Sequence, residues 1–83
     1  MLGQLTAEVS LEYDQEGDVL YLSLGAPRAA WSSPSPKLPG LLIRRAFDNG
    51  EVCGATVIGF SELDQAELDA VLPFRVDWRK LRR

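Results

Sequence analysis

The sequence predicts an α+β domain: an antiparallel four- to five-stranded β-meander of two hairpins, with one C-terminal helix packed on the sheet. Three observations support this. Short segments alternate apolar and polar residues or are wholly apolar, the turn motifs "DQEG" and "DNG" join them in pairs, and a helical pattern follows. The 83 residues fit one domain. We expect the sheet in residues 8–60, the helix in residues 61–72 and a basic tail in residues 73–83.

The first predicted hairpin is acidic at its turn. "EVSLEY" (residues 8–13) alternates strictly, which predicts a strand with one solvated face. "VLYLSL" (residues 19–24) is apolar on both faces and therefore predicts a more buried strand. The intervening "DQEG" is typical of a tight turn, in which we expect Gly17 to adopt a positive φ.

A proline-rich segment separates the two hairpins. Residues 25–40 contain four of the five prolines, and proline cannot donate a hydrogen bond within a central strand. A short edge strand around residues 28–33 remains compatible with the pattern, with Trp31 as its anchor. The rest of the segment is expected to be a long connection.

The second predicted hairpin contains the strongest turn signal. "LLIRRAF" (residues 41–47) reads as a strand, and "DNG" favours a type I′ turn with positive φ at both Asn49 and Gly50. "EVCGATVIGF" is the returning strand. Within it, Gly54 indicates a bulge or a close approach of two backbones.

The predicted helix is "SELDQAELDAVL", with Ser61 as its N-cap and Pro73 ending it. After it, residues 74–76 fit either a short strand or the start of a basic end.

The predicted sheet is larger than its helix can cover. Four paired strands of six residues present about 380 Å² on each face, and a twelve-residue helix covers only about half of one face. Because the strands at residues 19–24 and 41–47 are apolar on both sides, another segment or a second chain must cover the remainder. We therefore expect a homodimer.

Histidine is absent and cysteine occurs once, as Cys53. This excludes a histidine general base, a zinc site built from one chain and an intrachain disulfide. Neither a signal peptide nor an apolar run of about 20 residues is seen, so we expect a cytoplasmic protein. No phosphate-binding loop or catalytic motif occurs, so no cofactor and no catalytic residue is predicted.

The acidic turn allows two interpretations. Asp14, Glu16 and Asp18 could bind a hard cation such as Mg²⁺ or Ca²⁺ and serve a metal-dependent hydrolase. However, the glycine spacing differs from that of a calcium-binding loop, and Asp and Gly are what a tight turn requires. We favour the turn and assign no metal ligand.

The C-terminal residues are the most distinctive local feature. Residues 1–74 carry four basic and eleven acidic side chains, whereas residues 75–83 carry five basic and one acidic. Basic side chains around an aromatic ring suit nucleic acid; a solubilising tail that docks on acidic turns such as residues 14–18 is the alternative. The candidate interface or nucleic-acid residues are Trp31, Trp78, Arg75, Arg79, Lys80, Arg82 and Arg83.

The blocks "YDQEGDVLYLSL" and "FDNGEVCGATVI" resemble DUF2283, a small bacterial domain family of unknown function. The resemblance covers about residues 8–63. Where the family has acidic residues, this chain has Arg45–Ala46 and Thr56, so the resemblance implies that any site formed by those acids is damaged here. It further implies a compact β-rich domain with an accessory or antitoxin-like binding role.

Taken together, these observations predict a small protein–protein interaction module, homodimeric and non-enzymatic, without membrane association. Another small protein is a further partner to consider. Nucleic-acid binding through residues 75–83 is the alternative function.

Overall fold

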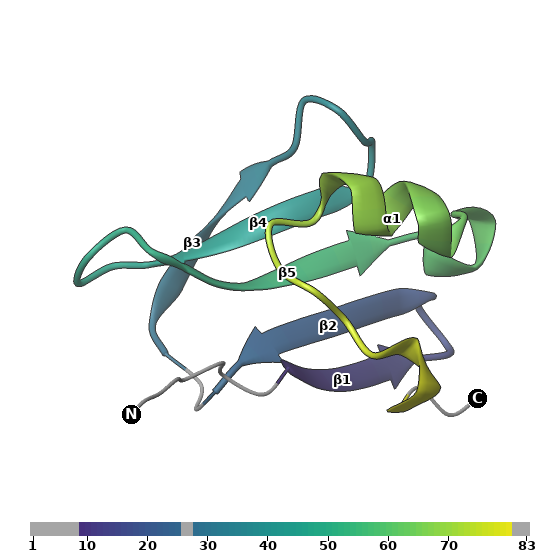
Figure 1. Ribbon diagram of the computed structural model, residues 1–83, viewed down its shortest axis with the longest axis horizontal. Helices are drawn as coiled ribbons and strands as arrows, with labels where there is room; N and C mark the ends of the chain where they lie inside the picture. Colours follow the sequence, from purple (N-terminus) through teal and green to yellow (C-terminus); the bar gives the residue numbers. More distant parts are fainter. Residues whose placement is uncertain (1–8, 26–27, 81–83) are drawn as a thin grey trace.

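The computed structural model describes residues 9–25 and 28–80 and confirms an α+β fold with an antiparallel sheet (Figure 1). Five strands form one open sheet in the order β1-β2-β5-β4-β3. The strands are β1 (Val9–Asp14), β2 (Val19–Leu24), β3 (Ala30–Pro34), β4 (Leu41–Ala46) and β5 (Val52–Ile58). The helix α1 (Gln65–Val71) lies between two short 3-10 turns, η1 (Phe60–Glu62) and η2 (Trp78–Lys80).

The strand order corrects the predicted meander. A meander would place β2 beside β3, but β2 pairs with β5, from Val19 opposite Ile58 to Ser23 opposite Gly54. Burial explains this arrangement, because the central strands must be apolar and free of proline. Leu20 and Val57 face each other across the β2–β5 pair and are both fully buried. The strand that ends in proline, β3, lies at an edge.

The turn between β1 and β2 differs from the prediction at one residue. Asp18, not Gly17, adopts the positive φ, at 55°. Asp14 Oδ1 accepts hydrogen bonds from the backbone N–H of Glu16 at 3.1 Å and of Gly17 at 3.4 Å, which closes the turn. Aspartate tolerates the left-handed region better than most residues, and this conformation directs Asp18 toward the segment after β5.

The β4–β5 hairpin is confirmed, but its predicted type I′ turn is wrong. Gly50 has a φ of 74°, while among the described non-glycine residues only Asp18 has a positive φ. The N–H of Ala46 donates to the Glu51 carbonyl at 2.9 Å, so four residues form the loop. A bulge opposite Arg44 and Arg45 explains this, since it shifts the register of β5 by one residue.

Gly54 was predicted to mark a bulge or a close approach of two backbones, and it lies next to this bulge and at such an approach. A Cβ atom at this position would lie 2.3 Å from the carbonyl oxygen of Leu22 in β2. The glycine therefore permits the close approach of the two central strands.

The predicted helix over residues 61–72 is interrupted and begins later. η1 comes first, Leu63 is extended, and α1 starts only after Asp64, whose side chain accepts from the N–H of Ala66 at 3.0 Å. Asp64 is thus the N-cap. Ser61 is not, because its hydroxyl and N–H both donate to Asp18. Residues 74–76 form no strand.

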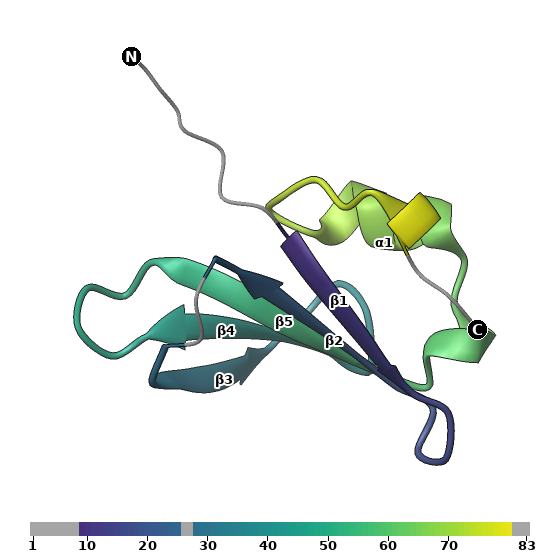
Figure 2. The ribbon, with the colours of Figure 1, turned by 90° about the horizontal axis from the view of Figure 1, so that it is seen from below.

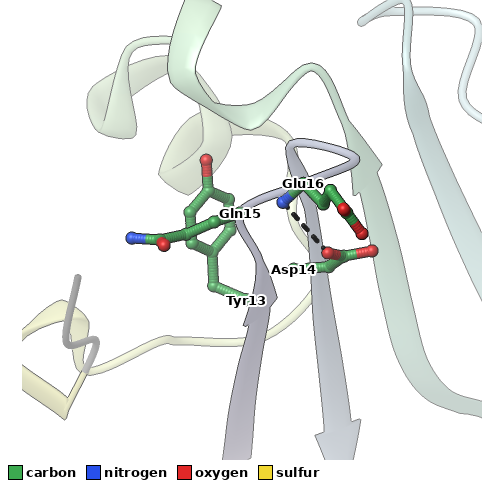
Figure 3. A pocket seen from close by; sticks show the side chains of 4 residues that line it. All are labelled: Tyr13, Asp14, Gln15 and Glu16. Carbon is green, nitrogen blue, oxygen red and sulfur yellow. Dashed lines mark hydrogen bonds between the residues drawn. The ribbon is translucent and has the colours of Figure 1, made fainter.

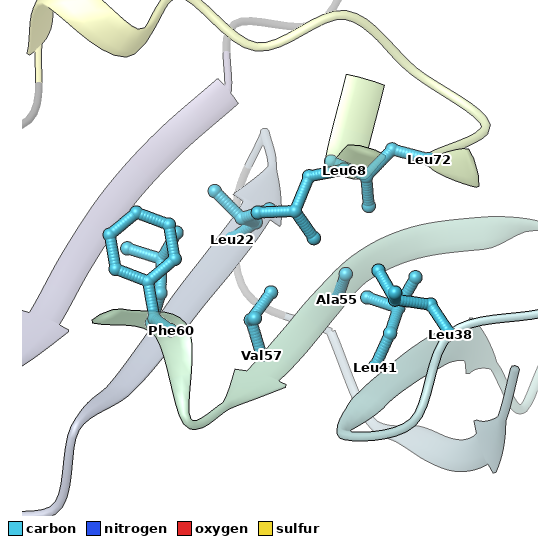
Figure 4. Close-up of a cluster of buried hydrophobic side chains, with 9 residues drawn as sticks. Leu22, Leu38, Leu41, Ala55, Val57, Phe60, Leu68 and Leu72 are labelled. Atoms are coloured by element: carbon cyan, nitrogen blue, oxygen red, sulfur yellow. The ribbon is translucent and has the colours of Figure 1, made fainter. Parts of the chain in front are cut away.

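The core lies on one side of the sheet. Side chains from β2, β5, β4, η1, α1 and the proline-rich segment meet there (Figure 4). The buried cluster consists of Leu20, Leu22, Leu38, Leu41, Ala55, Val57, Phe60, Leu68 and Leu72. Figure 2 shows α1 and the C-terminal segment on this same side. Within the described ranges, no helix or loop covers the opposite side.

Candidate functional site

The three carboxylates of the acidic turn have separate roles. Figure 3 shows Asp14 and Glu16 beside each other at the turn, with the Asp14 carboxylate held by a backbone amide. Asp18 instead accepts hydrogen bonds from the Tyr13 hydroxyl at 2.5 Å and from the Ser61 hydroxyl at 2.7 Å. Among residues 9–25 and 28–80, no three His, Cys, Asp or Glu side chains are placed to hold a metal ion. The observed contacts of Asp14, Glu16 and Asp18 are those of a structural turn.

Asp18 also ties this turn to the end of β5 through its backbone. Its carbonyl oxygen accepts from the N–H of Gly59 at 2.9 Å and of Phe60 at 3.1 Å. Together with the side-chain bonds to Ser61, these contacts join segments that lie 43 residues apart. Asp18 therefore fixes η1, and with it Phe60, against the first hairpin.

The C-terminal segment packs on its own chain. The Trp78 ring stacks on Phe60, with centroids 6.0 Å apart, and its Nε1–H donates to Asp69 Oδ1 at 3.0 Å. The indole is thus half-buried against η1 and α1 instead of presented to solvent for stacking on a base. Within the described residues, the tail docks on Asp69 of α1, which the sequence did not single out.

One basic residue of the tail forms an ion pair within the tail. Arg79 donates to Asp77 through Nε at 2.9 Å and Nη2 at 3.2 Å. These hydrogen bonds hold the pKa of the Asp77 carboxyl below its ordinary value, and they raise the pKa of the Arg79 guanidinium. Arg75 is exposed. Arg82 and Arg83 lie outside the described residues.

The uncovered side of the sheet carries apolar and polar side chains in neighbouring rows, and we call it the open face. One row across the five strands, in spatial order, is Glu12, Tyr21, Thr56, Leu42 and Pro34. The row on one side of it contains Val19 opposite Ile58, and the row on the other side is Ser10, Ser23, Gly54, Arg44 and Ser32. Tyr21 is 40% exposed and Ile58, the last residue of β5, 51%, so large apolar side chains remain in contact with solvent on this face.

Charge is divided between the two edges of the sheet. Residues 9–24, which form β1 and β2, contain no Lys or Arg, and their acids are Glu12, Asp14, Glu16 and Asp18. Residues 28–46, which include β3 and β4, contain no Asp or Glu, and their bases are Arg28, Lys37, Arg44 and Arg45. The sheet therefore has one acidic and one basic edge.

A second group of exposed apolar side chains lies at the basic edge. Trp31 on β3 contacts Phe47, which follows β4, with ring centroids 5.4 Å apart. Trp31 is 40% exposed and Phe47 66%, so both rings remain in contact with solvent. By their register both rings lie on the helix side, at the end of the sheet that α1 does not reach (Figure 2). We call this pair the aromatic ledge.

Trp31 was singled out from the sequence and Phe47 was not, because the exposure of Phe47 depends on where α1 ends in space. Cys53 is a free cysteine and is buried, at 6% exposure.

No family model matches the chain, and no curated protein and no solved structure matches it. The resemblance to DUF2283 stays a prediction. In the described part of the chain, no helix is long and apolar enough to cross a membrane.

Proposed function

We propose that this protein is a homodimeric protein–protein interaction module whose two open faces pack against each other. One observation carries the proposal: the open face combines exposed apolar side chains with charges of opposite sign toward its two edges. Such a surface is complementary to a second copy of itself, as a two-fold symmetric interface requires.

The charges select one orientation of the two copies. A two-fold axis parallel to β5 places β1 of one protomer over β3 of its partner, and β2 over β4. Glu12 of one protomer then lies over Pro34 of its partner, one strand or about 4.8 Å to the side of Arg44 and one row or about 7 Å along the strand from it, and the pair occurs twice. An axis perpendicular to the strands would instead place β1 over β1, with acids facing acids.

The area is near the minimum for a dimer. Five strands of six residues give a face of about 24 Å by 20 Å, or about 480 Å². Two such faces contribute about 960 Å², which is the size of a weak protein–protein interface. Burial of Tyr21 and Ile58 supplies apolar area, while the charge pairs supply orientation.

A charge-exchange experiment tests the proposal. Sedimentation would measure the dimer dissociation constant of the unchanged chain, of Glu12→Arg, of Arg44→Glu and of the double variant. We expect each single variant to weaken dimerisation about tenfold or more, because like charges then face each other, and the double variant to restore it. Glu62→Arg, an exposed acid on η1 away from this face, is the matched control.

Two results would contradict the proposal. A chain that remains monomeric at about 0.1 mM has no such dimer. A dimer that none of the exchanges weakens uses another surface. A second copy is a better-supported partner than nucleic acid, because the indole of Trp78 is engaged by Phe60 and Asp69.

A further inference from the structure

The outer edge of β3 directs backbone groups away from the sheet. The Phe47 N–H donates to the Ala29 carbonyl at 3.1 Å, and the Ser35 N–H donates to the Leu41 carbonyl at 2.9 Å. Hydrogen bonding alternates along an antiparallel strand, so the odd-numbered residues of this segment bond to β4. The N–H and C=O groups of Ala30 and Ser32 therefore point outward, where a further strand would bind.

Pro34 limits the length of this edge. It occupies the next outward-pointing position, where the absence of an N–H leaves the β3–β4 pairing unaffected. Strand pairing on this edge consequently has donors only at Ala30 and Ser32. This restricts docking to a short segment and protects the edge against extended sheet growth.

Side chains next to this edge offer both apolar and cationic contacts. The aromatic ledge, Trp31 with Phe47, leaves about 200 Å² of ring surface exposed beside β3, given the area of such side chains. Arg45 lies directly opposite Trp31 on β4 and is exposed. Arg28 precedes the strand, at 2.7 Å from Asp48.

We propose that the β3 edge binds a short, acidic, extended peptide segment of a partner protein by strand addition. The main chain of the segment pairs with Ala30 and Ser32. Its alternate apolar side chains rest on the aromatic ledge, and its carboxylates face Arg45 and the other cations of this edge. The site lies on the helix side of the sheet and is separate from the open face, so it does not depend on the proposed dimer.

Charge favours an acidic partner over a second copy at this edge. A second β3 strand would bring a second Arg45 to the same edge. Arg28 is already paired with Asp48, whereas Arg45 donates to the neutral carbonyl of Gly50. A second β3 strand would also bring its own Pro34, which leaves fewer donors for pairing. An acidic segment instead neutralises the bases and supplies a full set of backbone donors.

The experiment uses three synthetic ten-residue peptides and the full chain. One peptide alternates valine and glutamate, the second alternates valine and lysine, and the third has the first composition with prolines inserted. Binding is followed by amide and indole NMR signals, and hydrogen exchange is measured at Ala30 and Ser32. We expect the glutamate peptide to bind at least about tenfold more tightly than the lysine peptide, and to protect both amides.

Two variants separate strand addition from simple charge attraction. Ser32→Pro removes one outward donor while leaving the β3–β4 hydrogen bonds in place, so we expect it to abolish protection at Ala30 and weaken binding about tenfold. Ser32→Ala keeps the donor and is the matched control. Trp31→Ala should weaken binding and leave the charge preference unchanged.

The opposite results would overturn the proposal. These are no binding of the glutamate peptide up to about 1 mM, equal binding of the lysine or proline peptide, or binding unaffected by Ser32→Pro. Protection of the two amides that rises with protein concentration alone would show that a second copy occupies the edge instead. Loss of the open-face dimer in Glu12→Arg should leave peptide binding intact.

Discussion

The two sides of the sheet are built from the same strands but end in different environments. On the helix side, Leu20, Leu22 and Val57 are fully buried, because Phe60, α1 and the C-terminal segment close over them. On the open face, Tyr21 and Ile58 are exposed, whereas Gly54 is buried by the close approach of β2. The comparison teaches that the covering segments of residues 9–25 and 28–80 are enough for one face only.

The segments on the helix side are held in place by side-chain hydrogen bonds and ring contacts, and the open face has no such covering segments among the described residues. Asp18 holds η1 in place, and Trp78 is held by Asp69 and Phe60. Asp18 joins η1 to a hairpin 43 residues away, and Trp78 joins the C-terminal segment to α1 and η1. Stability should therefore be concentrated on the helix side, while variation on the open face should act on association.

The largest loss of unfolding free energy is expected in a comparison of two phenylalanines on the helix side. Phe60 is 1% exposed and contacts the rings of Tyr13 and Trp78, whereas Phe47 is 66% exposed. We expect Phe60→Ala to lower the free energy of unfolding by about 3–5 kcal/mol and Phe47→Ala by less than about 0.5 kcal/mol. Urea denaturation measures both. Equal losses would mean that burial is not what distinguishes these positions.

A smaller loss of unfolding free energy is expected on the open face, at the position that has least room for an added side chain. Gly54→Ala places a Cβ within 2.3 Å of the Leu22 carbonyl oxygen, so two central strands must separate. We expect a loss of about 3 kcal/mol in urea denaturation. Thr56→Ala, on the same strand and face, should cost far less. If both variants are tolerated, the central strands adjust more easily than the structure indicates.

Replacing Asp18 tests how much the hydrogen bonds between the first hairpin and η1 contribute to stability. Asp18→Ala removes the bonds to Tyr13 and Ser61 and puts alanine at a φ of 55°, so we expect a loss of about 2 kcal/mol. Asp14→Ala removes only exposed turn bonds and should cost about 0.5 kcal/mol. Near-ultraviolet circular dichroism of Trp78 should change in the first variant alone. The reverse order of the two losses would show that the turn, and not the hydrogen bonds to η1, matters.

The smallest effect concerns the exposed Asp77–Arg79 pair. Because the pKa of Asp77 is lowered in the folded chain, the pair stabilises above the unfolded pKa, and this is lost as pH falls through the folded pKa. The pair is solvent-exposed, so we expect Asp77→Asn to leave the urea midpoint unchanged at neutral pH. An NMR titration should show the lowered pKa, and Arg79→Gln should return it toward its ordinary value. An unchanged pKa in Arg79→Gln would contradict the assignment.

Local patterns were enough to predict most of the elements, but not how they combine. The strands and hairpins follow from alternation and turn residues that lie close together in the sequence. The β2–β5 pairing does not, because it depends on which strands are buried most deeply. The start of α1 was misplaced because Asp18, 43 residues away, binds Ser61 and leaves Asp64 to cap the helix.

The candidate surfaces were only partly predictable. The excess of apolar sheet surface was visible in the sequence, since it follows from counting faces against one helix. The aromatic ledge was not, because exposure of Phe47 depends on where α1 ends in space. The docking of Trp78 was also hidden, as its partner Asp69 looked like any solvated helix residue.

The β2–β5 pairing also constrains how the chain can fold. Each hairpin closes a short loop and can form within microseconds, but neither provides a core alone. The core requires β2 to find β5 across the proline-rich segment, with Val19 meeting Ile58. Loop closure costs only about 0.6 kcal/mol more for each doubling of length, so inserting residues into that segment should slow the encounter of the hairpins only modestly. The rate-limiting event is therefore expected to be the docking of two preformed hairpins.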